Sequence, residues 1–91
     1  MIKETEVEII GSIINDFGVF KKDRNGERID FLITHYLSKI SNANWTVLYQ
    51  DPKDKRYWEL NYPQSYLHGG GPAALTVLTQ QEASEKYEIL T

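Results

Sequence analysis

The chain of 91 residues contains no cysteine, two histidines and no long apolar run. The absence of cysteine excludes a disulfide framework, a thiolate zinc site and a thiol nucleophile, so packing must supply the stability. A membrane-spanning helix needs about 20 consecutive apolar residues, and no segment has them. What is present is 41% hydrophobic and 25% charged residues, which is typical of a globular chain. We therefore expect residues 1–91 to form a single domain.

Basic residues are fewer than acidic ones: the chain has ten Lys and Arg and thirteen Asp and Glu, which gives a net charge of −3. Direct nucleic-acid binding needs an excess of cations to neutralise phosphates, so this balance disfavours it. The segments 1–20 and 57–91 are acidic and the segment 21–56 is basic. The N-terminus lacks the basic and apolar regions of a secretory signal, so we expect a cytoplasmic protein with no membrane partner.

The first half of the chain predicts strands followed by one long helix. β-branched residues predict a strand over residues 6–14, with a bulge or a close backbone approach at Gly11, and a short return strand over residues 19–20. Apolar residues at helical spacing then predict an amphipathic helix that Asp23 caps and whose His35 faces solvent. The stripe consists of Ile29, Leu32, Ile33, Tyr36, Leu37 and Ile40, and the helix is expected to end at Ser41, Asn42 and Asn44.

The second half predicts a hairpin, a further strand and a short helix. Residues 45–50 and 56–62 read as two strands joined by a type I turn at Asp51–Asp54. A strand over residues 74–78 and a helix over residues 80–87, begun by a Thr79–Glu82 capping box, complete the order β-(β)-α-β-β-β-α. We therefore expect an α+β fold: a small antiparallel sheet with the long amphipathic helix packed on one face and a short C-terminal helix.

Catalytic and metal-binding spacings are missing. Ser65, His68 and Asp51 do not form a recognisable triad pattern, and the Gly69–Gly71 run lacks the Lys-Ser/Thr that follows a phosphate-binding loop. We expect no enzyme, no metal and no cofactor. A small-molecule or anion-binding module, or a minor hydrolase, that uses His68 and Gly69–Gly71 stays open as the alternative, as does a structural or homo-oligomeric interaction protein.

Aromatic and amide side chains gather near the predicted hairpin and the long connection after it. Such side chains combine a large contact area with polar tips, which is typical of protein-binding surfaces. The candidate contact residues are Asp51, Asp54, Tyr57, Glu59, Gln64, Tyr66 and His68.

The same region resembles the immunity protein 27 family. The resemblance lies in Trp45-x-x-Leu48-Tyr49-x-Asp51-Pro52, in Tyr57-Trp58-Glu59-Leu60-x-Tyr62-Pro63-Gln64-Ser65 and in His68-Gly69-Gly70-Gly71-Pro72. It implies a non-enzymatic cytoplasmic protein of a polymorphic toxin or contact-dependent inhibition system, which binds and neutralises the C-terminal domain of a cognate toxin. The acidic ends of the chain would suit a basic nuclease toxin.

Residues shared across such a family can maintain the fold instead of contacting the toxin. We expect this structural role for Trp45, Trp58, Tyr62, Pro63, Gly69, Gly70, Gly71 and Pro72. The two tryptophans are expected in the core of the sheet, and the glycines are expected to supply positive φ or close backbone approach.

Overall fold

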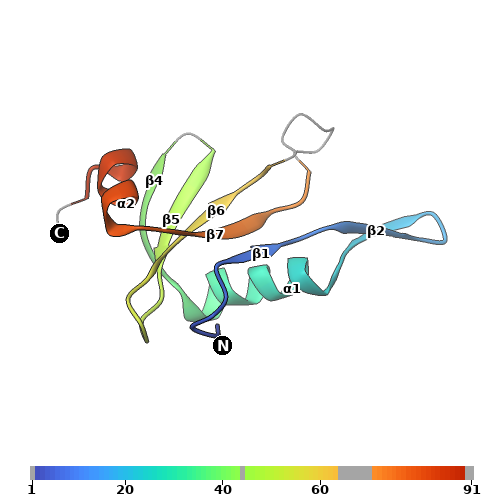
Figure 1. Cartoon of the computed structure of the whole chain (residues 1–91). Helices are drawn as coiled ribbons and strands as arrows, with labels where there is room; N and C mark the ends of the chain where they lie inside the picture. Colours follow the sequence, from blue (N-terminus) through green and yellow to red (C-terminus); the bar gives the residue numbers. More distant parts are fainter. Residues whose placement is uncertain (1, 44, 64–70, 90–91) are drawn as a thin grey trace.

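The computed structural model describes residues 2–43, 45–63 and 71–89. Within these residues the fold is α+β, as expected, with a five-stranded antiparallel sheet, a two-stranded sheet and two α-helices (Figure 1). No helix in this part of the chain is long and apolar enough to cross a membrane. The elements are β1 Glu8–Ile10, β2 Ile13–Asp16, β3 Val19–Lys22, α1 Arg24–Phe31, the π-helical turn η1 Leu32–Tyr36, β4 Ser38–Ala43, β5 Thr46–Gln50, β6 Tyr57–Asn61, β7 Ala74–Leu78 and α2 Gln80–Tyr87.

The large sheet has the strand order β1-β7-β6-β5-β4, so the first strand of the chain pairs with the last. β4 to β7 follow one another as antiparallel neighbours, and β1 adds to the free edge of β7. β2 and β3 pair only with each other and project from the body as a separate hairpin (Figure 1). The molecule is therefore elongated, with extents of 48 × 27 × 20 Å.

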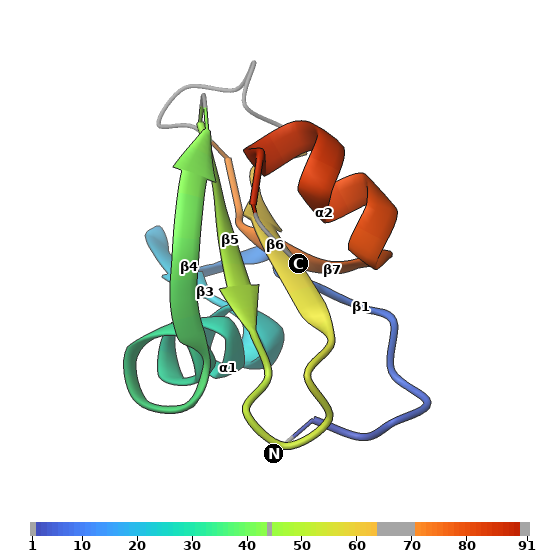
Figure 2. The same ribbon diagram turned by 90° about the vertical axis from the view of Figure 1, so that its left-hand side faces the viewer.

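The two helices cover opposite faces of the large sheet (Figure 2). On one face the buried side chains of Trp58 and Leu75 pack with Ile29 of α1 in the main hydrophobic core. On the other face Leu48 forms a smaller core with α2. Because alternate residues of a strand point to opposite faces, β5 and β6 contribute to both cores.

The helix in the middle of the chain is shorter than the sequence predicts. α1 and η1 end at Tyr36, where Leu37 turns to an extended conformation, and residues 38–43 form the edge strand β4. Ile40 is accordingly not part of a buried helical stripe but is 40% exposed on β4. The backbone groups of this segment pair with β5, and that long-range pairing overrides a helical pattern that local spacing favours.

Several local predictions are confirmed. Asp23 caps α1 by accepting a hydrogen bond from the Gly26 amide, and Thr79 with Glu82 forms the capping box of α2. The β5–β6 hairpin and β7 lie where they are expected, and His35 is exposed. The first predicted strand is divided into β1 and β2 at Gly11, where a Cβ atom would lie 2.8 Å from the Ala73 carbonyl oxygen.

Candidate functional site

The β2–β3 hairpin, residues 13–22, is the most exposed apolar feature of the described chain, and we call it the arm. Five large apolar side chains on it are exposed: Ile13 46%, Ile14 47%, Phe17 100%, Val19 57% and Phe20 72%. The strand register places Ile13 and Phe20 on one face of the arm and Ile14 and Val19 on the other. Each face thus carries two exposed apolar side chains together with a lysine, Lys22 on the first face and Lys21 on the second. The arm meets the body near its root, where Ile13 and Lys22 line a cleft with α1.

The tip of the arm is a two-residue turn formed by Phe17 and Gly18, both with positive φ, 51° and 82°. Positive φ at both positions is the geometry of a type I′ turn, in which Asn, Asp or Gly is the usual first residue. Asn15 supports the turn by accepting a hydrogen bond from the Gly18 amide at 3.0 Å. The turn thus holds a fully exposed phenylalanine at the point of the arm farthest from the body.

The root of the arm is fixed to the body by hydrogen bonds. The Asp23 amide donates to the Ser12 carbonyl at 2.9 Å, and Asp23 Oδ1 accepts from the Ser12 and Gly26 amides. These backbone donors, Gly26 first, lower the pKa of Asp23, so the carboxylate stays charged in its capping role. The Gly11 amide donates to the carbonyl of Ala73, the residue before β7, at 2.9 Å. The arm therefore has a defined base from which its apolar tip projects.

A cleft of about 120 Å³ lies between the arm root and the body. Its wall includes Ile13 of the arm, Ile29 and Ile33 of the helical segment and Tyr62 after β6. Lys22, at its edge, forms an exposed ion pair with Asp30. The volume is comparable with the ~150 Å³ apolar cavities that accept one small hydrophobic group. The cleft thus extends the apolar surface of the arm onto the body.

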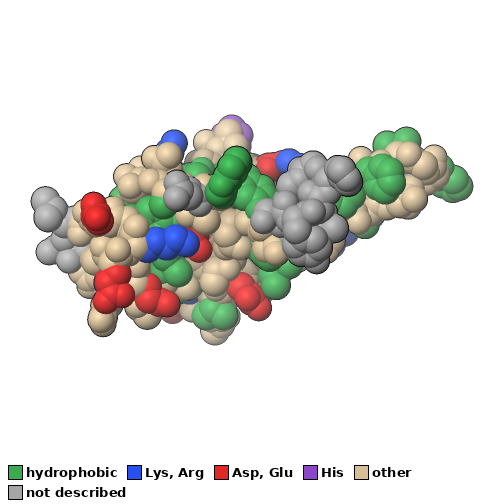
Figure 3. All heavy atoms as spheres, turned by 90° about the horizontal axis from the view of Figure 1, so that it is seen from above, with side chains coloured by type: hydrophobic (Ala, Val, Ile, Leu, Met, Phe, Trp, Pro, Cys, Tyr) green, Lys and Arg blue, Asp and Glu red, His purple; other side chains and the backbone are tan. Residues whose placement is uncertain are grey.

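The two ends of the large sheet differ in charge. At one end lie the β4–β5 turn, the described ends of the β6–β7 connection and the residues that lead from β1 into the arm. Their residues, 43–46, 61–63, 71–73 and 10–12, include no charged side chain, and we call this the uncharged end. The opposite, charged end carries the β5–β6 turn, with Asp51, Asp54 and Arg56. In Figure 3 hydrophobic side chains lie along the arm, and several acidic ones lie toward α2.

The candidate contact residues of the β5–β6 turn serve the fold at the charged end. Asp51 is 1% exposed and accepts hydrogen bonds from the Tyr36 hydroxyl at 2.7 Å and the Lys53 amide at 2.8 Å. The bond to Asp51 raises the pKa of Tyr36 to about 12. Asp54 is half-buried and pairs with Arg56 at 2.7 Å. Asp51 is therefore not the exposed contact that the sequence suggests, because its carboxylate holds the turn and η1 together.

Tyr57 and Glu59 lie under α2 rather than on a free surface. Glu59 is 9% exposed, and its Oε2 accepts from the Tyr87 hydroxyl at 2.8 Å and from Lys86 Nζ at 2.6 Å. Burial, together with this carboxylate, raises the pKa of Tyr87 to about 12. Tyr57 is half-buried against the small core of α2. Glu59, a candidate contact residue, is therefore buried, because α2 covers that face of the sheet.

The remaining candidate contacts, Gln64, Tyr66 and His68, lie outside the described residues, as do Gly69 and Gly70 of the structural motif. Gly71 is described and has φ 69°, which agrees with the expected role of a glycine there. Pro72 is half-buried and lines the cleft. The described part of the chain contains no group of three or more His, Asp or Glu side chains that could hold a metal ion.

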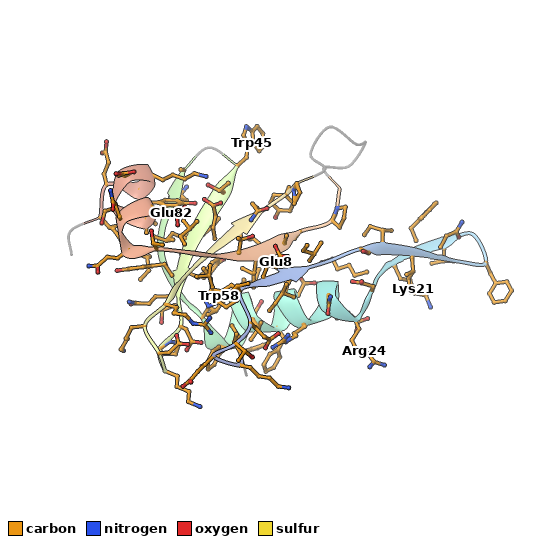
Figure 4. The ribbon with its side chains drawn as sticks, in the orientation of Figure 1. Glu8, Lys21, Arg24, Trp45, Trp58 and Glu82 are labelled. Carbon is orange, nitrogen blue, oxygen red and sulfur yellow. The ribbon has the colours of Figure 1, made fainter. Side chains whose placement is uncertain are left out.

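The two tryptophans have opposite environments. Trp58 is fully buried between the sheet and α1, as expected, but Trp45 is 89% exposed at the β4–β5 turn and points away from the body (Figure 4). The expected burial of Trp45 is therefore wrong, because the strand begins one residue later and the turn carries the side chain outward. Tyr62, 41% exposed, and Pro63, also exposed, lie at the uncharged end.

The exposed apolar surface of the arm is the candidate feature that sequence reasoning missed. A β-branched run indicates a strand, but it does not distinguish a core strand from a projecting one. A signal was nevertheless present, because Phe17-Gly18 occupies a turn between two strands, and a large aromatic residue in a two-residue turn has no core to enter. Apolar residues on both faces of so short a hairpin are a second signal.

Comparison with known proteins identifies the family. The family model for immunity protein 27 matches residues 16–79, more than half of the chain, from the tip of the arm to the N-cap of α2. Searches of curated proteins and of solved structures gave no match. The chain belongs to the immunity protein 27 family.

Proposed function

We propose that this chain is an immunity protein that binds the C-terminal domain of a cognate bacterial toxin in the cytoplasm and blocks its activity. It would thereby protect the producing cell from its own toxin or from that of its siblings. The observation that carries the proposal is the arm, whose five apolar side chains are exposed on both faces. Family membership supports the same role, because an immunity protein acts by binding a partner.

The exposed aromatic side chains of the arm have the chemistry of an interface core. Phe17 and Phe20 expose on the order of 300 Å² of aromatic surface, since a full phenylalanine side chain offers about 150–250 Å². Monomeric proteins seldom expose a contiguous apolar patch beyond a few hundred Å² unless it binds something. An isolated two-stranded hairpin is only marginally stable in water, so a partner that covers the arm would also stabilise it.

The proposal therefore places the toxin on the arm and the uncharged end of the sheet. The charged turn suggested by sequence is less suitable, because Asp51 is buried and Asp54 already pairs with Arg56. Depletion of charge at the centre of an interface and enrichment in aromatic residues agree with this placement. The acidic N- and C-terminal segments remain available to steer a basic toxin, such as a nuclease, toward the complex.

The test is co-expression with the toxin C-terminal domain encoded immediately upstream, scored by growth and by co-purification. We expect the wild-type chain to restore growth and to form a stable complex. Replacing Phe17 and Phe20 together by Ser should abolish protection, because burying each side chain contributes about 1.5–3 kcal/mol. The toxin affinity should fall at least about a hundredfold. The fold should persist, since both side chains are exposed.

Phe31→Ser is the matched control. Phe31 is also an exposed aromatic, 48% accessible, but it lies on α1 beside His35 and belongs neither to the arm nor to the residues that line the cleft. Its replacement should leave the toxin affinity within about threefold of wild type. Wild-type affinity in the double Phe17/Phe20 variant would show that the toxin binds another surface. Continued toxicity and no complex with the wild-type chain would contradict the immunity role itself.

A further inference from the structure

Trp45 combines two unfavourable features, a left-handed backbone that the tight β4–β5 turn between Ala43 and Thr46 imposes and an exposed indole that this turn does not require. Its backbone has φ 62°, in the left-handed region, and its side chain is 89% exposed. A bulky residue in that region is an outlier, because its Cβ crowds the following carbonyl at a cost of roughly 1–2 kcal/mol. Glycine or asparagine would occupy the position more easily.

The exposure of Trp45 excludes a packing explanation among the described residues. The side chain points away from the body of the protein at the β4–β5 turn (Figure 4). The core on each face of the sheet is complete without it, since Trp58 fills one face and Leu48 the other. Strained residues of this kind cluster at binding sites, where the strain is retained because the side chain has a role.

The surroundings of Trp45 indicate the chemistry of its partner. The turn belongs to the uncharged end, where Ala43 and Thr46 flank it and Tyr62 is exposed on the neighbouring strand end. The sequence has no charged residue from position 40 to position 50. Interface centres have this composition, and tryptophan is the residue most enriched among the contacts that dominate binding energy. A partner of matching chemistry presents an apolar pocket here.

The position of Trp45 also indicates which partner it is. The β4–β5 turn lies at the same end of the sheet as the residues that lead from β1 into the arm. A protein that covers the arm and continues over the uncharged end therefore reaches Trp45 without crossing the charged turn. The toxin domain is the one partner that the proposed function supplies.

We propose that Trp45 is an anchor contact for the toxin domain, which accepts the indole in an apolar pocket that has a hydrogen-bond acceptor for Nε1–H. The inference rests on the proposed function and adds a second, separate contact point to the arm. The indole offers a large rigid surface with one polar edge and has only two rotatable side-chain bonds, so little conformational freedom is lost on association.

The test uses Trp45→Gly, for which stability and binding should change in opposite directions. Glycine relieves the left-handed strain, so the melting temperature should stay equal or rise by a few degrees. The affinity for the toxin domain, refolded after separation from the co-purified complex, should fall about 30-fold or more. A role of Trp45 in maintaining the fold predicts the reverse: a lower melting temperature with the affinity of the folded fraction unchanged.

Lys55→Gly is the matched control. Lys55 also has positive φ, 67°, and is exposed, but its turn is at the charged end. Its replacement should raise the melting temperature in the same way and leave the affinity within about threefold of wild type. Trp45→Asn repeats the test with a residue that tolerates the left-handed region and keeps a side chain.

The outcomes separate this inference from the proposed function. If the double Phe17/Phe20 variant loses affinity but both Trp45 variants bind like the wild type, the anchor is refuted and the immunity role stands. If the wild-type chain does not bind the toxin domain, both fail. A loss of affinity of equal size in Lys55→Gly would also refute the anchor. So would a change of oligomeric state in the Trp45 variants at unchanged toxin affinity, which would assign the contact to a second copy of the chain.

Discussion

The N-terminal segment is held to the body by an ion pair whose strength can be tested by pH. Glu6 accepts two hydrogen bonds from Arg28 of α1, at 2.7 and 2.8 Å, and its backbone carbonyl accepts one from Arg56 at 2.6 Å. The paired Arg28 guanidinium is the main cause that lowers the pKa of Glu6 from 4.5 to about 2. We predict that Glu6→Gln destabilises the fold at neutral pH.

The size of the effect follows from the pKa. A fall from 4.5 to about 2 corresponds to about 3 kcal/mol for a fully shielded carboxylate, because each pKa unit is worth 1.36 kcal/mol. The Glu6 side chain is 25% exposed, so solvent screening reduces the expected loss to about 1–2 kcal/mol. For a domain of this size that lowers the melting temperature by about 5–10 °C.

The pH dependence has a defined sign. The folded state lowers the pKa of Glu6, so its contribution to stability is complete above pH 4.5 and is lost as the pH falls from 4.5 toward 2. Urea unfolding of wild type and Glu6→Gln at about pH 7 and about pH 3 measures the difference in unfolding free energy. Glu4→Gln, at an exposed position of the same segment, should change it by less than about 0.5 kcal/mol. An equal deficit of Glu6→Gln at both pH values would refute the electrostatic reasoning.

Two further substitutions test the packing of the body. Gly11→Ala should lower the free energy of unfolding in urea by about 1–3 kcal/mol, because the new Cβ would lie 2.8 Å from the Ala73 carbonyl oxygen. A decrease below about 0.5 kcal/mol would show that the Gly11 and Ala73 backbones move apart easily. Tyr87→Phe should cost about 1–3 kcal/mol by the same measurement, because buried Glu59 loses a hydrogen-bond donor, and an unchanged stability would mean that Lys86 alone satisfies the carboxylate.

The parts of the fold that the sequence predicts well are those with local chemical signals. Asp23 and Thr79 mark helix starts because their side chains satisfy free backbone amides one turn later. β7 is predicted at residues 74–78 because a short β-branched segment is bounded by turn residues. These signals depend only on neighbours within a few positions, so no knowledge of the tertiary fold is needed.

The end of the central helix could not be predicted from the spacing of apolar residues, because it depends on tertiary contacts. The apolar stripe continues to Ile40, yet the helix ends at Tyr36, whose hydroxyl bonds to Asp51 across the fold. Residues 38–43 then complete the sheet on the free edge of β5. Spacing along the sequence contains no information about which sheet edge is open, so the helical reading of residues 37–40 was wrong.

The candidate site was predicted least well, because residue type does not determine exposure. Tryptophan is usually buried and aspartate usually exposed, but Trp45 is 89% exposed and Asp51 1% exposed. Glu59 has the alternation of a surface position, yet α2 returns from the end of the chain to cover it. The burial of Asp51 and that of Glu59 depend on contacts with segments distant in sequence, whereas the exposure of Trp45 follows from its place in the β4–β5 turn.

The central claim is that the toxin covers the arm and the uncharged end of the sheet. Amide hydrogen exchange of the chain alone and in complex with the co-purified toxin domain tests it most directly. We predict that binding protects residues 13–22 and the β4–β5 turn at Trp45, while the β5–β6 turn at residues 51–56 exchanges at the same rate in both states. Protection of residues 51–56 with unchanged exchange in the arm would contradict the account.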